Sequence, residues 1–281
     1  MQTRTTRAAA ALALPLFLGL GACSGADQAA PAGNSTTAAT SEQAAADPFT
    51  VAPGTQVDVA TFLGETQKAQ QDKKTFHMQM TMSAQGQKIT MTGDQDVSDP
   101  NKPKATLTMS APGQTGGVDM IMDGESVYLK MPGQAGGKFV KMSMQDLAAQ
   151  GGVDFKKMMN PSESLKAQQQ AIDAITFKGE EDVSGEKLRR YALVIDPVKA
   201  QKAAGATNVP APTGTAAAKI PYDVWVDSGK LVRKMQLTQN GATIDMAVSK
   251  YGEPVKVAAP PAAQVTTAPA MPGSQPAPSA S

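Results

Sequence analysis

Apolar and polar residues alternate along residues 76–91. The apolar positions are Phe76, Met78, Met80, Met82, Ile89 and Met91. Gly86 interrupts the run, and glycine is typical of the tight turns that join neighbouring strands. A period of two places every second side chain on the same side of an extended chain. The pattern therefore predicts two β-strands, each with one apolar face, joined by a turn.

The same alternation continues along residues 107–129. Its apolar positions are Leu107, Met109, Met120, Met122, Val127 and Leu129. Asp123-Gly124 is a hairpin signal, because glycine readily adopts the positive φ that tight hairpin turns require. Residues 139–141 add a further short strand.

The C-terminal part of the chain is also predicted to be strand. The predicted strands span residues 188–195, 222–227, 231–239 and 243–251. Ser228-Gly229 and Asn240-Gly241 separate the last three, which predicts a three-stranded antiparallel meander. The apolar positions of its first two strands include Val224, Val226, Met235 and Leu237.

Three segments have the apolar periodicity or end signals of helices: residues 57–71, 161–174 and 197–204. In the second, Pro161 stands near the start, and Leu165, Ile172 and Ile175 make the apolar side. Ser143 and Asp146 have the spacing of a capping box, with Asp in place of Glu.

These elements predict an α+β domain. It contains an antiparallel sheet of roughly eight or more strands, each apolar on one face only, as in sheets with a single covered face. The few helices cannot cover both faces, so we expect them to pack on the apolar one.

The N-terminus has the parts of a secretory signal. Arg4 and Arg7 precede an apolar run at residues 8–20, which at about 13 residues is too short to span ~30 Å of hydrocarbon. The run ends in Leu20-Gly21-Ala22-Cys23, the pattern of a bacterial lipobox. We therefore expect export by the general secretory route, cleavage after residue 22 and lipidation of Cys23.

Cys23 is the only cysteine of the 281 residues. Once its sulfur carries a diacylglycerol, no thiol remains for a disulfide, a redox role or a nucleophile. Acyl chains such as palmitate would hold the protein on the extracytoplasmic side of the cell membrane. Whether the new N-terminus is also acylated stays open.

Composition divides the rest of the chain. Residues 23–54 and 258–281 are rich in Ala, Pro, Ser and Thr without apolar periodicity, which predicts a disordered tether and a disordered tail. Residues 55–257 are enough for one domain with a sizeable core. Within it, residues 205–219 form a Gly/Ala/Pro/Thr loop that we expect to be the entrance to any cavity.

Charge excludes one class of partner. Without residues 1–22 the chain has 24 basic and 25 acidic residues. Such a balance gives no electrostatic basis for nucleic-acid binding, nor for a basic face that adheres to membranes.

The C-terminal strands carry a family resemblance. Residues 220–235 (IPYDVWVDSGKLVRKM), Tyr251-Gly-Glu-Pro-Val255 and Ala259-Pro-Pro261 resemble the LppX/LprG family of actinobacterial lipoproteins. The order of elements from about residue 57 to 264 is similar as well. The resemblance implies a strongly curved antiparallel half-barrel with helices in its concave face, like the Lol lipoprotein carriers. It also implies a lipid or glycolipid bound in an apolar cavity and carried through the envelope. This chain departs from the family in its longer tail and its many methionines.

The methionines, 16 in the whole chain, admit three interpretations. The methionines pack in the core, form a deformable lining for a long apolar ligand, or bind Cu(I) through their thioether sulfurs. Along one strand, Met78, Met80 and Met82 are spaced ~6.5 Å apart, too far for all three sulfurs to bind one ion without distortion. The resemblance favours the lining. The residues predicted to line a cavity are Met78, Met80, Met82, Ile89, Met91, Leu107, Met109, Met120, Met122, Val127, Leu129, Val224, Val226, Met235 and Leu237.

The remaining candidates do not make a catalytic site. His77 is the only histidine and is out of phase with the apolar residues, so it should face solvent. The chain has no Gly-x-Ser-x-Gly elbow, and we expect no catalytic residue, no cofactor and no bound metal. Trp225 is in phase with Asp223 and Asp227 on the outer face, where it contacts a partner or packs over neighbouring strands. Residues 180–182 are interpreted as a charged loop.

We therefore expect a monomeric, membrane-anchored extracytoplasmic lipoprotein that binds, and can carry, lipid or glycolipid. The alternative is a sensor or interaction lipoprotein that regulates an envelope protein partner without transporting a ligand. A structural envelope lipoprotein is a third interpretation.

Overall fold

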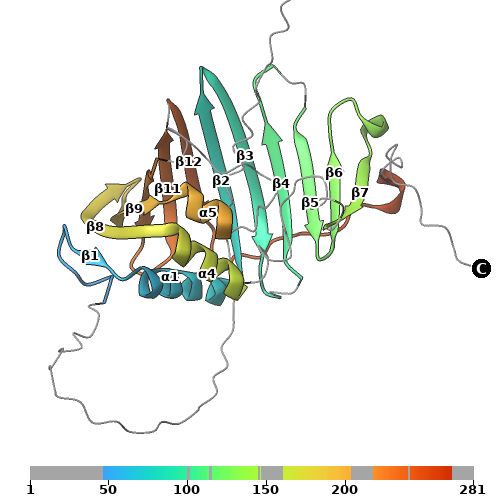
Figure 1. Cartoon of the computed structure of the whole chain (residues 1–281). Helices are drawn as coiled ribbons and strands as arrows, with labels where there is room; N and C mark the ends of the chain where they lie inside the picture. Colours follow the sequence, from blue (N-terminus) through green and yellow to red (C-terminus); the bar gives the residue numbers. More distant parts are fainter. Residues whose placement is uncertain are drawn as a thin grey trace, which may run out of the picture.

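The structure is a computed structural model and describes residues 47–99, 102–113, 116–144, 146, 161–203, 218–239 and 241–267 (Figure 1). The strands are β1 (Gln56–Val57), β2 (Thr75–Ala84), β3 (Gln87–Asp96), β4 (Lys104–Ser110), β5 (Val118–Asp123), β6 (Ser126–Lys130), β7 (Phe139–Ser143), β8 (Ile172–Val183), β9 (Glu186–Ile195), β10 (Ile220–Val226), β11 (Val232–Gln239), β12 (Ala242–Ser249) and β13 (Val265–Thr267). The helices are α1 (Val59–Lys73), α4 (Pro161–Ala171), α5 (Pro197–Ala203) and the 3₁₀ turns η1 (Ala135–Gly137) and η3 (Ala262–Gln264).

Within the described residues, thirteen strands form one sheet in the order β1-β8-β9-β10-β11-β12-β2-β3-β4-β5-β6-β7-β13. Neighbouring strands are antiparallel, except that β13 runs parallel to β7. β1 and β13 lie at opposite edges, so the sheet is open. The predicted α+β class is confirmed, and the strands predicted around residues 76–91, 107–129 and 222–251 are present as β2 to β6 and β10 to β12.

Tight turns set the register of the hairpins. Gln85 and Gly86 between β2 and β3 both have positive φ, as do Ser184 and Gly185 between β8 and β9. Two consecutive positive φ angles match the right-handed twist of the flanking strands. Asp182 Oδ1 accepts a hydrogen bond from the Gly185 amide at 2.9 Å, which stabilises the second turn.

The helices gather over one half of the sheet. α1 begins after Asp58, whose Oδ1 accepts a hydrogen bond from the Thr61 amide at 2.8 Å and thereby caps the first turn. This cap explains why the helix starts at Val59 and not at residue 57. α1 and α4 contact each other and β8, and Figure 1 shows them with α5 on the β8–β12 side, while β4 to β7 extend beyond them.

The main core lies between these helices and the sheet. Its buried residues are Val57, Phe62, Leu63, Ile172, Ile175, Phe177, Tyr191, Leu193, Val224 and Val226. Phe62 and Leu63 come from α1, and most of the others come from β8, β9 and β10. Tyr191 contacts the rings of both Phe62 and Phe177, with centroids 4.6 and 5.2 Å apart.

The strand β8 was not predicted. Residues 161–174 were expected to form one helix and residues 180–182 a loop, but α4 ends at Ala171 and β8 runs from Ile172 to Val183. The spacing of Ile172 and Ile175 fits a helix as well as an extended chain with a bulge. The structure has such an irregularity between Ile172 and Ala174, and it places Ile175 opposite Leu193.

Both ends of the domain extend past the expected limits of 55 and 257. Residues 47–54, the N-terminal segment, pack onto the core, and Pro48 is fully buried. At the other end η3 and β13 continue the fold to Thr267, where β13 pairs with β7. These contacts reach parts of the chain far away in sequence, so local composition did not reveal them. Cys23, residues 204–217 and residues 268–281 lie outside the described residues.

Candidate functional site

The strand register aligns methionines from five adjacent strands into one cross-strand row. In the order β11, β12, β2, β3 and β4, this methionine row consists of Met235, Met246, Met80, Met91 and Met109. Each is directly opposite the next. Opposed residues of antiparallel strands have Cβ atoms ~4.5–5.5 Å apart, so their side chains are neighbours. The sequence could not show this row, because it depends on which strands pair.

Further rows run parallel to it on the same face. One contains Val248, Met78, Gly93, Leu107, Met120, Leu129 and Val140, and another contains Leu237, Ile244, Met82 and Ile89. Met122 and Val127 are opposed in a third row, and Val224 is opposite Met235. The fifteen residues predicted to line a cavity therefore share one face of the sheet, which we call the inner face.

The residues of the inner face differ in burial. Its buried members are Met78, Met80, Val127, Val224, Val226 and Leu237. Its partly buried members are Met82, Ile89, Met91, Leu107, Met120, Met122, Leu129 and Met235. Met109 is exposed, at 37% of its surface. Val224 and Val226 belong to the main core, while the partly buried and exposed members leave part of this apolar face accessible to solvent.

Gly93 lies beneath the Leu107 side chain in this surface. It is opposite Leu107, and the Leu107 side chain leans over it, so that a Cβ added at Gly93 would lie 2.7 Å from Leu107 Cδ2. The same Cβ would overlap the Thr106 carbonyl oxygen. Glycine at this position lets β3 and β4 approach closely in the middle of the apolar face.

The opposite, outer face is polar and paired. Trp225 is buried there, and its Nε1 donates a hydrogen bond to Glu181 Oε2 at 2.8 Å. The Arg190 guanidinium donates to Glu181 and Asp223 at 2.8 and 2.9 Å. These bonds, first to Asp223 and then to Glu181, raise the pKa of Arg190. Trp225 thus packs over neighbouring strands, and Asp223 is ion-paired with Arg190.

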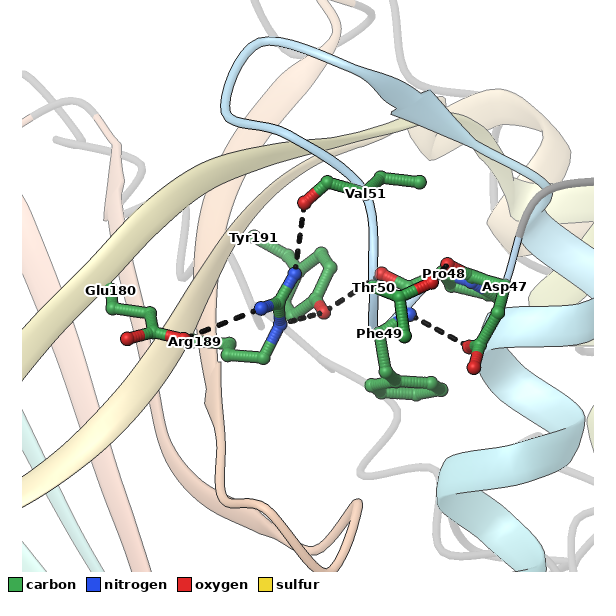
Figure 2. Close-up of polar contacts among 8 residues, drawn as sticks. All are labelled: Asp47, Pro48, Phe49, Thr50, Val51, Glu180, Arg189 and Tyr191. Atoms are coloured by element: carbon green, nitrogen blue, oxygen red, sulfur yellow. Dashed lines mark hydrogen bonds and ion pairs between the residues drawn. The ribbon is translucent and has the colours of Figure 1, made fainter.

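The N-terminal segment packs against α1 and β9 (Figure 2). Phe49 stacks on Phe62 with ring centroids 5.6 Å apart. The Tyr191 hydroxyl donates to the Pro48 carbonyl oxygen at 3.0 Å, and Arg189 Nη2 donates to the Val51 carbonyl oxygen at 3.2 Å. Arg189 also stacks over Phe177 at 3.9 Å. The N-terminal segment is therefore held firmly against β9.

The histidine singled out in the sequence pairs with one neighbouring carboxylate. His77 Nδ1 lies 2.8 Å from Asp94 Oδ1, a cross-strand neighbour on the outer face. In the part of the chain that the structure describes, no group of three or more His, Cys, Asp or Glu side chains is placed to hold a metal ion. Ser143 and Asp146 do form the predicted capping box, with hydrogen bonds in both directions between 2.7 and 3.1 Å.

The family model described as LppX_LprAFG lipoprotein matches residues 58–257 of this chain. A comparison with curated proteins finds no match. Within the described residues, none of the helices has the length and apolar character needed to cross a membrane.

Several solved structures are similar to the chain. LprF from Mycobacterium bovis is 15% identical, with 72% of this chain and 96% of that chain covered and a TM-score of 0.48. Lipoprotein LppX from Mycobacterium tuberculosis is 15% identical, with coverages of 71% and 98% and a TM-score of 0.48. A LolA superfamily protein from Nitrosomonas europaea is 11% identical, with coverages of 69% and 92% and a TM-score of 0.27.

Proposed function

We propose that this chain, which belongs to the LppX_LprAFG lipoprotein family, binds a lipid or glycolipid on the inner face of its sheet and carries it through the cell envelope. In this proposal the protein is anchored on the extracytoplasmic side of the cell membrane by lipid on Cys23. It has no catalytic role.

The observation that carries the proposal is the accessible part of the inner face. Met91, Leu107 and Met120 are only partly buried, and Met109 is exposed, although all lie within one continuous apolar surface. Contiguous apolar surface of this kind marks binding sites, because leaving it in water costs free energy. An acyl chain laid along it would gain ~0.8 kcal/mol for each buried CH₂ group.

Methionine suits such a surface. Its side chain is unbranched and polarizable, and it adapts to ligands of varied shape better than branched aliphatic side chains do. The accessible region thus favours long apolar chains over a rigid ligand of one fixed shape.

The attachment of the N-terminal segment is consistent with a carrier on a tether. Pro48 is buried in the domain, so 24 residues, from Ser24 to Asp47, separate it from the proposed anchor Cys23. A chain of this length can span at most about 80 Å. Because Pro48 and Phe49 pack against the core, the tether is joined to the folded domain at this point.

Lipid binding can be tested on the mature lipoprotein purified from its host in mild detergent. Native mass spectrometry and lipid extraction should find about one lipid per chain beyond the covalent anchor. Met91→Lys puts a charge on the inner face and should abolish this lipid. Thr92→Lys is the matched control, because Thr92 is opposite Gln79 and Thr108 on the outer face, and it should retain the lipid. If the wild type neither contains lipid nor takes any up from phospholipid vesicles, the proposal is wrong.

A further inference from the structure

We propose that the exposed end of the methionine row, Met109 and Met91, is an oxidation site that switches off ligand binding on the inner face. The inference rests on the proposed lipid-binding function and adds a mode of regulation to it. Oxidants of the peroxide class are the expected reactants.

The row concentrates oxidisable sulfur on one surface. Five thioethers come from five adjacent strands in direct opposition, and Met78, Met82 and Met120 lie in the rows beside them. The only cysteine in the chain is Cys23, whose sulfur the lipid anchor would occupy. No thiol is then left to react first, so the methionine sulfurs are the readily oxidised groups of the mature chain.

Burial differs along the row, and Met80 in its middle is more buried than Met246 and Met235 on one side and Met91 and Met109 on the other. Met109 is 37% exposed, Met91 is partly buried, and Met80 is only 8% exposed. Met78, in the adjacent row, is 1% exposed. Oxidant from solvent should therefore modify Met109 first, then Met91, and leave Met80 and Met78 unmodified while the protein stays folded.

The reaction is a two-electron oxygen transfer. The methionine sulfur attacks one oxygen of hydrogen peroxide and the O–O bond breaks. A new S–O bond forms, and the proton on the transferred oxygen passes to the second oxygen, which leaves as water. The sulfur is oxidised to the sulfoxide and the peroxide is reduced.

The product is poorly suited to an apolar ligand surface. A sulfoxide oxygen is a strong hydrogen-bond acceptor, while Met91 and Met109 have as cross-strand neighbours Met80, Val118 and each other. None of these side chains donates a hydrogen bond. An acyl chain bound there would strip water from the sulfoxide without replacing the lost hydrogen bonds, so the modified protein should bind it about tenfold more weakly.

The test uses the full mature lipoprotein and a fluorescent phospholipid presented in phosphatidylcholine vesicles. Graded hydrogen peroxide treatment is followed by peptide mass spectrometry and by measurement of lipid binding. We expect sulfoxide at Met109 and Met91 to accumulate in step with the loss of binding, and methionine sulfoxide reductases to restore it. The variant M91L together with M109L conserves apolar volume and should keep binding after the same treatment. Met131→Leu, between β6 and η1, is the control and should lose binding as the wild type does.

Two outcomes would overturn the inference: unchanged binding by a wild type that carries sulfoxide at both positions, or equal loss of binding in the M91L and M109L variant. Failure of the untreated wild type to bind the phospholipid would instead overturn the proposed function.

Discussion

The Tyr191 hydroxyl donates a hydrogen bond to the Pro48 carbonyl oxygen over 3.0 Å, joining residues 143 positions apart. The same hydroxyl accepts a hydrogen bond from Arg189 Nε at 3.0 Å. Tyr191 is fully buried, and this burial raises the pKa of its phenol. One buried hydroxyl therefore holds the N-terminal segment against β9 and stays protonated while doing so.

Tyr191→Phe should loosen the N-terminal segment without removing the ring from the core. We expect a loss of ~1–3 kcal/mol in the free energy of unfolding, because the Pro48 carbonyl oxygen and Arg189 Nε would lose their partner. Urea unfolding measures this loss. Chymotrypsin should also cut faster after Phe49. Tyr128→Phe, on β6 at the far end of the sheet, is the control; equal cleavage in both variants would contradict the role of the Tyr191 hydroxyl.

Gly93→Ala should destabilise the sheet, because the new methyl group would overlap the Thr106 carbonyl oxygen and crowd Leu107. Overpacking of this kind costs ~1–3 kcal/mol. Gly64→Ala, inside α1 with nothing within 4 Å of the added Cβ, should stabilise the protein by ~0.5–1 kcal/mol. Thermal and urea unfolding of the two variants should therefore move in opposite directions, and a neutral Gly93→Ala would show that β3 and β4 can separate without cost.

Local patterning was sufficient to predict much of the sheet. The alternation of Met78, Met80 and Met82 identified β2 and its apolar face, and Gly86 identified the turn that follows. Each of these signals arises from a few neighbouring residues, since strand periodicity and turn geometry are properties of the local backbone. The inner face of the candidate site could be predicted for the same reason.

Features that depend on pairing between distant segments could not be predicted. The methionine row exists because Met246 of β12 is opposite Met80 of β2, a contact that follows from the strand order and not from either segment alone. Pro48 lies in a segment with the composition of a linker, and Tyr191 supplies the contact that orders it. β13 is three residues long and has no periodicity of its own.

Stability should fall in acid partly through Glu181. Hydrogen bonds from Arg190, and then from Trp225, lower the pKa of Glu181. A carboxyl group with a lowered folded-state pKa stabilises the fold fully above its unfolded pKa of about 4.3, and the contribution is lost as the pH falls through the folded value. Glu181→Gln should therefore lose less stability than the wild type between about pH 5 and pH 3.

The fluorescence of Trp225, the only tryptophan in the chain, reports this unfolding directly. Glu253→Gln, at an exposed position after β12, is the control and should follow the wild type. Parallel pH profiles for the wild type and Glu181→Gln would exclude Glu181 as a contributor.

The predicted lipid anchor can be tested through Cys23. Cys23→Ser removes the sulfur that would carry the diacylglycerol, so the variant should lack the mass of the acyl chains and be left unprocessed or released. Membrane fractionation after carbonate washing, together with intact-protein mass spectrometry, distinguishes these states. Retention of both the acyl mass and membrane association by the serine variant would contradict the lipoprotein assignment of this residue.

The C-terminal boundary of the fold can be tested with two shortened chains. β13 pairs with β7 over Val265–Thr267, and a pocket of about 310 Å³ at this junction is lined by residues that include Tyr128, Lys141 and Pro260. A chain that ends at residue 267 retains all of these contacts and should unfold like the full-length protein.

A chain that ends at residue 257 loses the β13 pairing and the cover over Tyr128. We expect this shorter chain to be ~1–3 kcal/mol less stable in urea, because buried backbone and side-chain groups lose their partners. It should also self-associate at high concentration, since the uncovered β7 edge presents unpaired N–H and C=O groups to other molecules. Light scattering and urea unfolding measure the two effects, and identical behaviour of the two chains would mean that residues 258–267 add nothing to the fold.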